Sequence, residues 1–252
     1  INSAGVQLLP IDSEHSAIFQ AIASHPMNEV AKITITASGG SLRMLPADEL
    51  HDVTVDQVLD HPTWTMGAKV TVDSASLMNK ALELIEAHWL FGVGSERLDA
   101  VIHPQSIVHG MVEFCDGSVI AQLSPPDMKM PIQYALTWPK RRSGGSLSVD
   151  WSKQQSLDFE PMNFDRYPAV RLAFDVINQG GTAGAVFNAA NEVVAEAFLE
   201  QSLPFGSMIA IVEEVLGNSS ISDHVTFDSV VEADSEARKQ ASALVASHKV
   251  NS

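Results

Sequence analysis

Two acidic side chains flank a serine near the start of the chain, in the segment PIDSEHSAIFQ. Asp12 and Glu14 offer carboxylate oxygens, the ligand atoms that Mg²⁺ and Mn²⁺ prefer in proteins. The same residues also suit the start of a helix. Asp12 or Ser13 can accept bonds from the first backbone amides, and Glu14 favours the positive end of the helix dipole. The local pattern favours the helix start and leaves one edge of a metal site open.

A second group of polar residues lies on a predicted helix, within VDSASLMNKALELIEAHWLFGVG. Asp73 or Ser74 is predicted to cap this helix, and its apolar side chains, Trp89 included, cover one side. Four polar side chains fall on the opposite side, within roughly 120° of arc: Asn79, Lys80, Glu83 and Glu86. A solvated face with Lys80 paired to Glu83 is the simpler interpretation, and a ligand site is the alternative.

The elements that must position these residues begin with a strand. AKITITASGG alternates isoleucine with threonine and stops at Gly39-Gly40, which predicts a strand running into a loop. Residues 38–69 are rich in turn formers, and a connection of that length is typical of a functional lid. Further on, Asp116-Gly117 predicts a type I′ turn between two strands. The second strand, through Val119 to Leu123, could pair with another copy of the chain.

The C-terminal part has a helical composition from about residue 164, where Asp165 is a predicted helix cap. Four amphipathic segments with short connections indicate a helical bundle. We therefore expect an α+β fold. It comprises a catalytic part with a small mixed sheet flanked by helices over residues 1–137, a linker over 138–163 and a C-terminal bundle over 164–252.

Composition excludes several classes of protein. The net charge is −16, from 31 acidic and 15 basic residues, which disfavours non-specific binding to nucleic acid or to an anionic membrane. No run approaches the roughly 18 apolar residues of a membrane span, and the first residues lack the basic region of a signal peptide. The single cysteine, Cys115, excludes an intrachain disulfide.

Five stretches together carry a family resemblance: LLPIDSEHSAIFQ, TASGG, HPTWTMGAKVTVDSASLMNKALELIEAHWLF, IHPQSIVHGMVEFCDGSVIAQLSPPDM and DRYPA…NAANE. In this order they resemble 1-deoxy-D-xylulose 5-phosphate reductoisomerase. That NADPH-dependent family makes 2-C-methyl-D-erythritol 4-phosphate in non-mevalonate isoprenoid biosynthesis. The match extends over nearly the whole chain.

The resemblance implies a divalent cation, Mg²⁺ or Mn²⁺, held by Asp12, Glu14 and Glu83. We expect an extended stretch to place Asp12 and Glu14 on one side. It also implies a sugar-phosphate substrate. The implied substrate contacts are Ser13, Ser38, His61, Trp64, Ser74, Asn79, Lys80 and His109, of which Ser38, Ser74, Asn79 and Lys80 hold the phosphate.

The implied catalytic residues are Ser13, Lys80, Glu83 and His109, although a hydrogen-bonded strand histidine is an alternative for His109. In the implied reaction the cation polarises the ketone, the carbon skeleton rearranges and NADPH delivers hydride. Met66 and Met128 are the implied contacts of the nicotinamide. His61, Trp64 and Met66 lie on the expected lid. The other histidines considered, His15, His25, His51, His88 and His103, are expected to be structural.

Two departures from the family pattern stand out. The chain reads GGSLR where the family commonly continues Gly-Gly-Pro-Phe-Arg, so that Ser41 replaces a proline and is expected to loosen the loop slightly. The chain also holds no strand–GxGxxG–helix unit and does not begin with methionine. We therefore expect the catalytic and C-terminal parts without the N-terminal NADPH-binding domain, and negligible turnover by the chain alone.

Two other interpretations stay open. A metal-dependent sugar-phosphate isomerase or lyase could use the same site without redox chemistry, and a dimerising scaffold could use Asp12 only as a helix cap. The resemblance implies a homodimer in the cytoplasm of a bacterium, with a plastid as the alternative. No nucleic-acid or membrane partner is expected.

Overall fold

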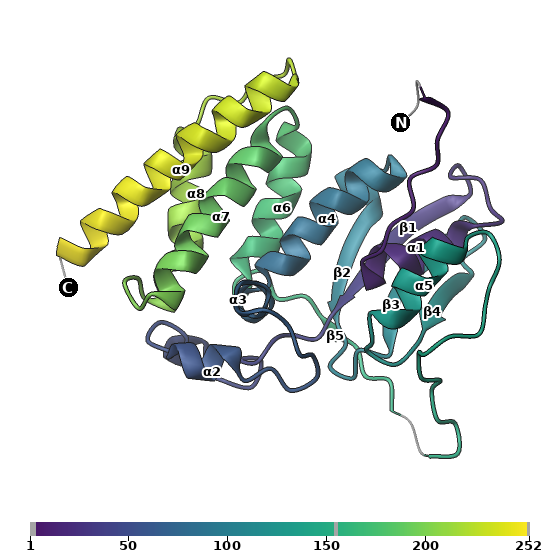
Figure 1. Cartoon of the computed structure of the whole chain (residues 1–252). Coiled ribbons are helices and arrows are strands. Elements are labelled where there is room, and N and C mark those ends of the chain that lie inside the picture. Colours follow the sequence, from purple (N-terminus) through teal and green to yellow (C-terminus); the bar gives the residue numbers. More distant parts are fainter. Residues whose placement is uncertain (1–3, 154–155, 251–252) are drawn as a thin grey trace. The chain divides into compact units, whose positions relative to one another are not determined.

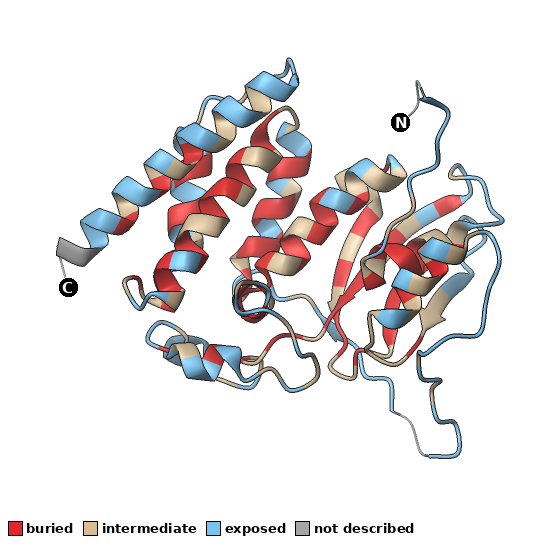
Figure 2. Cartoon of the chain, in the orientation of Figure 1, coloured by how far each residue is buried: buried red, intermediate tan, exposed pale blue. Residues whose placement is uncertain are grey.

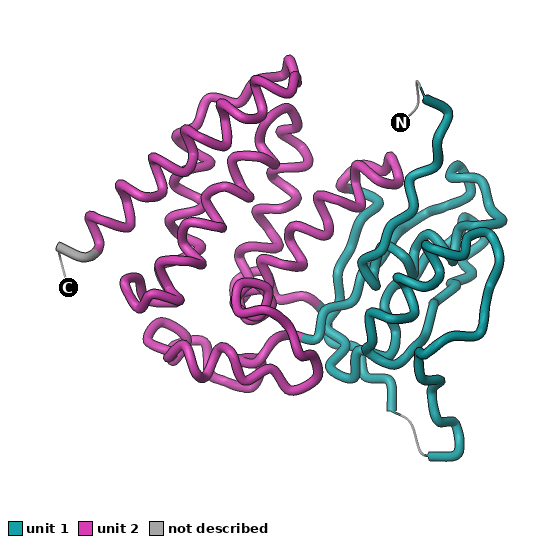
Figure 3. The backbone as a smooth tube through the Cα atoms, in the orientation of Figure 1, with its two compact units in different colours: residues 1–38, 96–161 teal, residues 39–95, 162–252 magenta. Residues whose placement is uncertain are grey.

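Figure 1 shows the computed structural model, which describes residues 4–153 and 156–250. The chain divides into two compact units that alternate along the sequence (Figure 3). Unit 1 comprises residues 1–38 and 96–161, and unit 2 comprises residues 39–95 and 162–252. The predicted functional division differs from this one, because residues 39–95 group with the C-terminal helices. A catalytic role for residues 1–137 stays a prediction.

Unit 1 is built on a five-stranded mixed sheet of order β4-β3-β1-β2-β5. β1 (Val30–Ala37) pairs in parallel with β2 (Leu98–Ile102) and antiparallel with β3 (Val108–Phe114). β4 (Val119–Leu123) pairs with β3, and the short β5 (Glu160–Pro161) pairs with β2. The Ile33 and Ile35 side chains are fully buried, as the alternating pattern of β1 predicts.

The β3–β4 hairpin confirms the predicted position of the turn but corrects its type. Only Gly117 has a positive φ, at 84°, whereas a type I′ turn needs two such residues. The Gly117 amide donates to the Phe114 carbonyl, and the Phe114 amide donates to the Ser118 carbonyl. The loop is therefore a three-residue turn that ends on a left-handed glycine.

Two helices pack in unit 1, α1 (Ser13–Ile22) and α5 (Lys129–Thr137). α1 contacts β3, β4 and β1, and its Ile18 side chain is fully buried. The Phe19 ring meets the Trp138 ring edge-on at 4.9 Å, next to Tyr134 of α5. Residues 138–159, apart from the undescribed 154–155, form no helix or strand, and β5 lies within the predicted linker of residues 138–163.

Unit 2 is helical. Its longer helices in chain order are α2 (Val55–Leu59), α3 (Ala68–Ser76), α4 (Met78–Phe91), α6 (Pro168–Gln179), α7 (Ala183–Leu199), α8 (Met208–Asn218) and α9 (Phe227–Val250). Short 3-10 turns lie at η2 (Ala47–Glu49) and η4 (Phe205–Ser207), and η3 (Ser95–Arg97) spans the boundary with unit 1. The α+β fold with a C-terminal helical bundle is confirmed.

α7 is the central helix of unit 2 and packs against α3, α6, α8 and α9. Figure 2 shows it buried over much of its length, whereas α9 exposes most of one side. α9 contributes Ala237, Ala241 and Val245 to the core, spaced by four residues so that they share one helical face. Among the described residues, no helix is both long and apolar enough to cross a membrane.

Two predicted helix starts are wrong. α6 begins at Pro168, after an N-cap at Tyr167, because proline is pre-organised for the first helical position. Asp165 lies before it, in a turn where the Asn163 side chain accepts its amide. The predicted helix from Ser74 is really two helices. Leu77, with φ 56° and ψ 18°, separates α3 from α4.

Candidate metal and phosphate site

The first acidic motif lies at the start of α1. Asp12 is the N-cap, and its Oδ1 accepts the Ser13 amide at 2.9 Å. The Ser13 hydroxyl donates to Glu14 Oε2 at 2.5 Å. The expectation of an extended stretch over these residues is wrong, because helical geometry begins at Ser13. The motif does cap a helix, and Asp12 Oδ2 still faces a second group.

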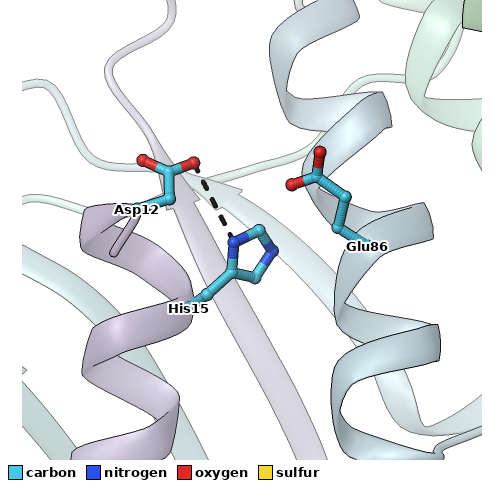
Figure 4. A group of neighbouring side chains, drawn as sticks. All are labelled: Asp12, His15 and Glu86. Atoms are coloured by element: carbon cyan, nitrogen blue, oxygen red, sulfur yellow. Dashed lines mark ion pairs between the residues drawn. The ribbon is translucent and has the colours of Figure 1, made fainter. Parts of the chain in front are cut away.

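That second group is His15, which the sequence analysis treated as structural. Its Nδ1 lies 3.9 Å from Asp12 Oδ2, as Figure 4 shows, and its side chain is 2% exposed. The signal for this contact was the spacing of three residues, since side chains three apart on a helix are neighbours. At this distance the two atoms do not form a hydrogen bond, and they form an ion pair only when the His15 ring is protonated.

His109 lies on β3 with 3% of its surface exposed. Its Nε2 lies 3.1 Å from the Ser124 carbonyl oxygen, which can only accept a hydrogen bond. The Nε2 atom therefore carries a proton and donates it to this carbonyl. The hydrogen-bonded strand histidine that the sequence left open describes this geometry, and a substrate role stays a prediction.

The second acidic motif lies in the first turns of α4, in unit 2. Lys80 Nζ and Glu83 Oε2 are 2.5 Å apart, and Asn79 Nδ2 donates to Glu83 Oε1 at 2.5 Å. The Lys80–Glu83 pair is present, but the interpretation of a solvated face is wrong for these two residues. The two side chains are only 4% and 3% exposed. Burying an ion pair costs several kcal/mol per ion, by order of magnitude, and burial of this kind is typical of functional sites.

Ser74 lies in the last turn of α3, so its expected place at a helix start is wrong. The segment after β1 approaches it closely. A Cβ on Gly40 would lie 2.6 Å from the Ser74 carbonyl oxygen, which only glycine avoids. The Ser41 hydroxyl donates to the Val58 carbonyl of α2 at 2.7 Å. This bond ties down a loop that the absence of proline was expected to loosen.

Arg166 also holds this loop, a role that its sequence position did not predict. Its Nη2 donates to the carbonyls of Leu42, Arg43 and Leu45 at 2.9, 3.2 and 2.8 Å. Its guanidinium lies over the Tyr167 ring, 5.4 Å from the centroid. Its place in the DRYPA motif was the only signal in the sequence, because the contacts join residues more than 120 positions apart.

His61 organises the turn that carries Trp64. Its Nδ1 accepts the amides of Thr63 at 3.1 Å and Trp64 at 3.0 Å, so the ring is neutral with its proton on Nε2. Burial lowers the pKa of His61 from its usual 6.5, which favours the same neutral form. Trp64 and Met66 are half-buried, as is Met128 at the N-cap of α5.

Each unit holds some of the predicted site residues. Unit 2 brings Asn79, Lys80 and Glu83 into contact, and unit 1 brings Asp12, Ser13 and Glu14 together. The other candidates divide between Ser38, His109 and Met128 in unit 1 and His61, Trp64, Met66 and Ser74 in unit 2.

Two family models match the chain. Residues 8–91 match the 1-deoxy-D-xylulose 5-phosphate reductoisomerase C-terminal domain, and residues 123–240 match the DXP reductoisomerase C-terminal domain. The chain belongs to the 1-deoxy-D-xylulose 5-phosphate reductoisomerase family. The reductoisomerase of Pelodictyon phaeoclathratiforme is 49% identical over 98% of the chain. The chain spans 64% of the length of that relative.

Solved reductoisomerases share the fold. The Zymomonas mobilis enzyme, solved with NADPH, is 43% identical with a TM-score of 0.90 and covers 97% of the chain, which in turn covers 63% of that enzyme. A second reductoisomerase, solved with NADPH, fosmidomycin and magnesium, is 35% identical with a TM-score of 0.91. The match covers 97% of the chain and 64% of that structure.

Proposed function

We propose that the chain carries the metal- and substrate-binding part of a 1-deoxy-D-xylulose 5-phosphate reductoisomerase. In this proposal the complete enzyme uses NADPH to form 2-C-methyl-D-erythritol 4-phosphate for isoprenoid biosynthesis. The observation that carries the proposal is the buried cluster of Asn79, Lys80 and Glu83 in the first turns of α4. An apolar residue would pack at this position without the cost of burying a carboxylate, so folding alone does not explain the cluster.

The donor set fits a hard divalent cation. Asp12, Glu14 and Glu83 would supply only carboxylate oxygens, which suits Mg²⁺ or Mn²⁺ better than Zn²⁺. A bound cation would supply positive charge beside the substrate oxygens. The role of the chain is then to hold these ligands: the Ser13 hydroxyl orients Glu14, and Asn79 and Lys80 orient Glu83.

The phosphate of the substrate would be held by Ser38, Ser74, Asn79 and Lys80. The amides at the start of α4 and the Lys80 ammonium favour a dianion, because the positive end of the helix dipole lies there. Ser13 and Lys80 are the candidates to hold or move a proton at the substrate hydroxyls, and His109 would contact the substrate. Trp64, on the turn that His61 organises, would close over the substrate and exclude water.

Met66 and Met128 would contact the nicotinamide through apolar side chains. For the 252-residue chain by itself we expect binding of metal and sugar phosphate without appreciable NADPH oxidation. Sugar-phosphate-dependent oxidation of NADPH by this chain, followed by absorbance, would contradict that expectation.

The metal site is tested by calorimetric titration of Mn²⁺ into the parent and into Asp12→Asn and Glu83→Gln. Asparagine is as good an N-cap as aspartate, so Asp12→Asn removes the ligand charge while α1 stays capped. We expect Mn²⁺ binding in the parent that is lost in both variants. The control Asp116→Asn alters an exposed aspartate of unit 1 and is expected to bind like the parent. Equal binding in the parent and Asp12→Asn would leave Asp12 with its capping role alone.

A second copy of the chain is the proposed partner. β4 is an edge strand of the unit 1 sheet, and Val119 and Ile120 on it are 54% and 39% exposed. Such an edge is a template for pairing with another strand. Ile120→Lys is expected to shift a dimer toward monomer in sedimentation velocity, whereas an unchanged dimer would place the interface elsewhere. A cytoplasmic location is likewise a proposal.

A further inference from the structure

The carboxylate of Asp73 is buried in unit 2, directly before the proposed phosphate ligand Ser74. Its residue is 1% exposed, and both of its oxygens have partners. Oδ2 lies 2.5 Å from Lys69 Nζ, one turn earlier on α3, and Oδ1 accepts Asn191 Nδ2 of α7 at 3.1 Å. Burial raises the pKa of Asp73, so the position is costly for an ionised group.

Asn191 is also an energetically unfavourable residue at a buried position of α7. Its side chain is fully buried, and among the described residues its Oδ1 has no hydrogen-bond partner. An unsatisfied buried polar atom destabilises a fold, and leucine would fill a similar volume without that cost. The buried side chains of Asp73 and Asn191 are both unfavourable for folding, and together they form one specific hydrogen bond between α3 and α7.

That bond adds a directional contact to the packing that sets the rotation of α3 about its own axis. Successive residues of a helix are turned by about 100°, so a directional contact at Asp73 also constrains the direction of the next side chain, Ser74. Three residues later the chain passes through the left-handed Leu77, and Ser76 Oγ accepts the Met78 amide that begins α4. A rotation of α3 would thus move both Ser74 and the first turn of α4, which holds Asn79 and Lys80.

We propose that Asp73 and Asn191 form a positioning pair that aims Ser74 and the first turn of α4 at the phosphate of the substrate. This role rests on the proposed function, because it presumes that these residues bind the phosphate. It is distinct from general stabilisation, because the pair is expected to act on phosphate affinity more than on metal affinity or on folding.

The test compares Asn191→Leu and the isosteric Asn191→Asp with the parent, in calorimetric titrations of 1-deoxy-D-xylulose 5-phosphate in the presence of Mg²⁺. Asn191→Leu has no donor for Asp73, and Asn191→Asp can donate to it only as a protonated carboxylic acid. We expect the dissociation constant to rise about tenfold, the equivalent of one hydrogen bond of about 1.4 kcal/mol. Mn²⁺ affinity should fall less than sugar-phosphate affinity, since two of the three proposed metal ligands, Asp12 and Glu14, lie at the start of α1.

Two further variants separate positioning from stability. Val212→Ala removes volume from a fully buried position on α8 and lowers stability away from the α3–α7 bond. It is expected to bind the sugar phosphate like the parent. The double variant Asp73→Asn/Asn191→Asp reverses the pair, restores one N–H···O bond and is expected to recover most of the lost affinity.

Each outcome decides a different point. Parent-like affinity in the Asn191 variants overturns the positioning role, as does an equal loss in Val212→Ala. If Asn191→Asp fails to fold, Asn191→Leu still decides. A parent chain that binds Mn²⁺ but no sugar phosphate contradicts the proposed function itself, and the positioning role falls with it.

Discussion

Gly40 lies so close to α3 that a Cβ at this position would be 2.6 Å from the Ser74 carbonyl oxygen and 2.7 Å from the Ala75 Cα. Both neighbours are backbone atoms, which cannot swing away as a side chain could. The absence of a side chain at Gly40 is therefore what allows this loop to pack on the last turn of α3.

Gly40→Ala should destabilise the chain through two separate effects. The φ of +72° is unfavourable for alanine, by about 1–2 kcal/mol, and the overlap adds about 1–3 kcal/mol. Gly92→Ala is the matched control, because it has a φ of +64° but nothing within 4 Å. Urea unfolding should show a clearly larger loss for Gly40→Ala, and equal losses would mean that the loop can move away from α3.

Arg166→Met should loosen the loop of residues 39–45, because it removes three hydrogen bonds to the carbonyls of Leu42, Arg43 and Leu45. We expect a loss of about 2 kcal/mol, since bonds from a charged donor are stronger than neutral ones. Amide hydrogen exchange in the loop should rise with it. The control Arg171→Met breaks an exposed pair with Glu213 and should cost under about 1 kcal/mol. Parent-like exchange in Arg166→Met would show that other contacts hold the loop.

The turn of residues 61–64 should loosen in mild acid. His61 has a pKa below its usual 6.5, so the folded state resists a proton that the unfolded state accepts. The stability tied to the neutral ring is present above pH 6.5 and is lost as the pH falls from there through the folded pKa. Protonation of Nδ1 would also remove the acceptor of the Thr63 and Trp64 amides.

Hydrogen exchange at the Thr63 and Trp64 amides, corrected for its intrinsic pH dependence, measures this effect. We expect protection to fall between pH 6.5 and 5 in the parent. In His61→Phe, which cannot titrate or accept these bonds, protection should be low at both pH values. Constant protection in the parent would show that the ring stays neutral throughout the range.

His103→Phe should be strongly destabilising although it keeps an aromatic ring. His103 Nε2 accepts the amides of Ile107 and Val108, Nδ1 bonds to the Asp158 carbonyl, and the ring stacks on Phe159. Phenylalanine preserves the stacking but leaves three backbone groups unpaired. Each of these groups that water does not reach lowers the stability by about 1–3 kcal/mol. Thermal unfolding measures the loss, with the exposed His224→Phe as the control. A small change would mean that water replaces the imidazole.

The sequence predicts which residues share a helix face, and where turns lie, better than it predicts which faces are buried. Helical spacing correctly placed Lys80 and Glu83 together, but it could not show that their side of α4 is buried. It also placed Trp89 on the buried side, whereas this side chain is 65% exposed. Periodicity reports which residues share a face, and other parts of the chain decide whether that face meets solvent.

The break at Leu77 shows a second limit. The predicted single helix followed from good helix formers throughout, and leucine gives no local signal for a φ of 56°. The hydrogen bond between α3 and α7 joins Asp73 to Asn191, which is 118 residues further along the chain. The motifs of the candidate site could be recognised because they are contiguous in the sequence. The positioning contacts of Asp73 and Arg166 could not be, because they join distant segments.

The alternation of the two units along the chain has a consequence for how the protein is made. Synthesis produces residues 1–38 of unit 1, then 39–95 of unit 2, before it returns to each of them. β1 can pair with β2 only after the intervening residues 39–95 have been made. In the same way, α3 and α4 can pack on α6 and α7 only after those helices have been made. Unit 1 is complete only when residue 161 has been made, and unit 2 needs residues 162–252 as well. A ribosome that stopped before residue 161 would leave both units incomplete.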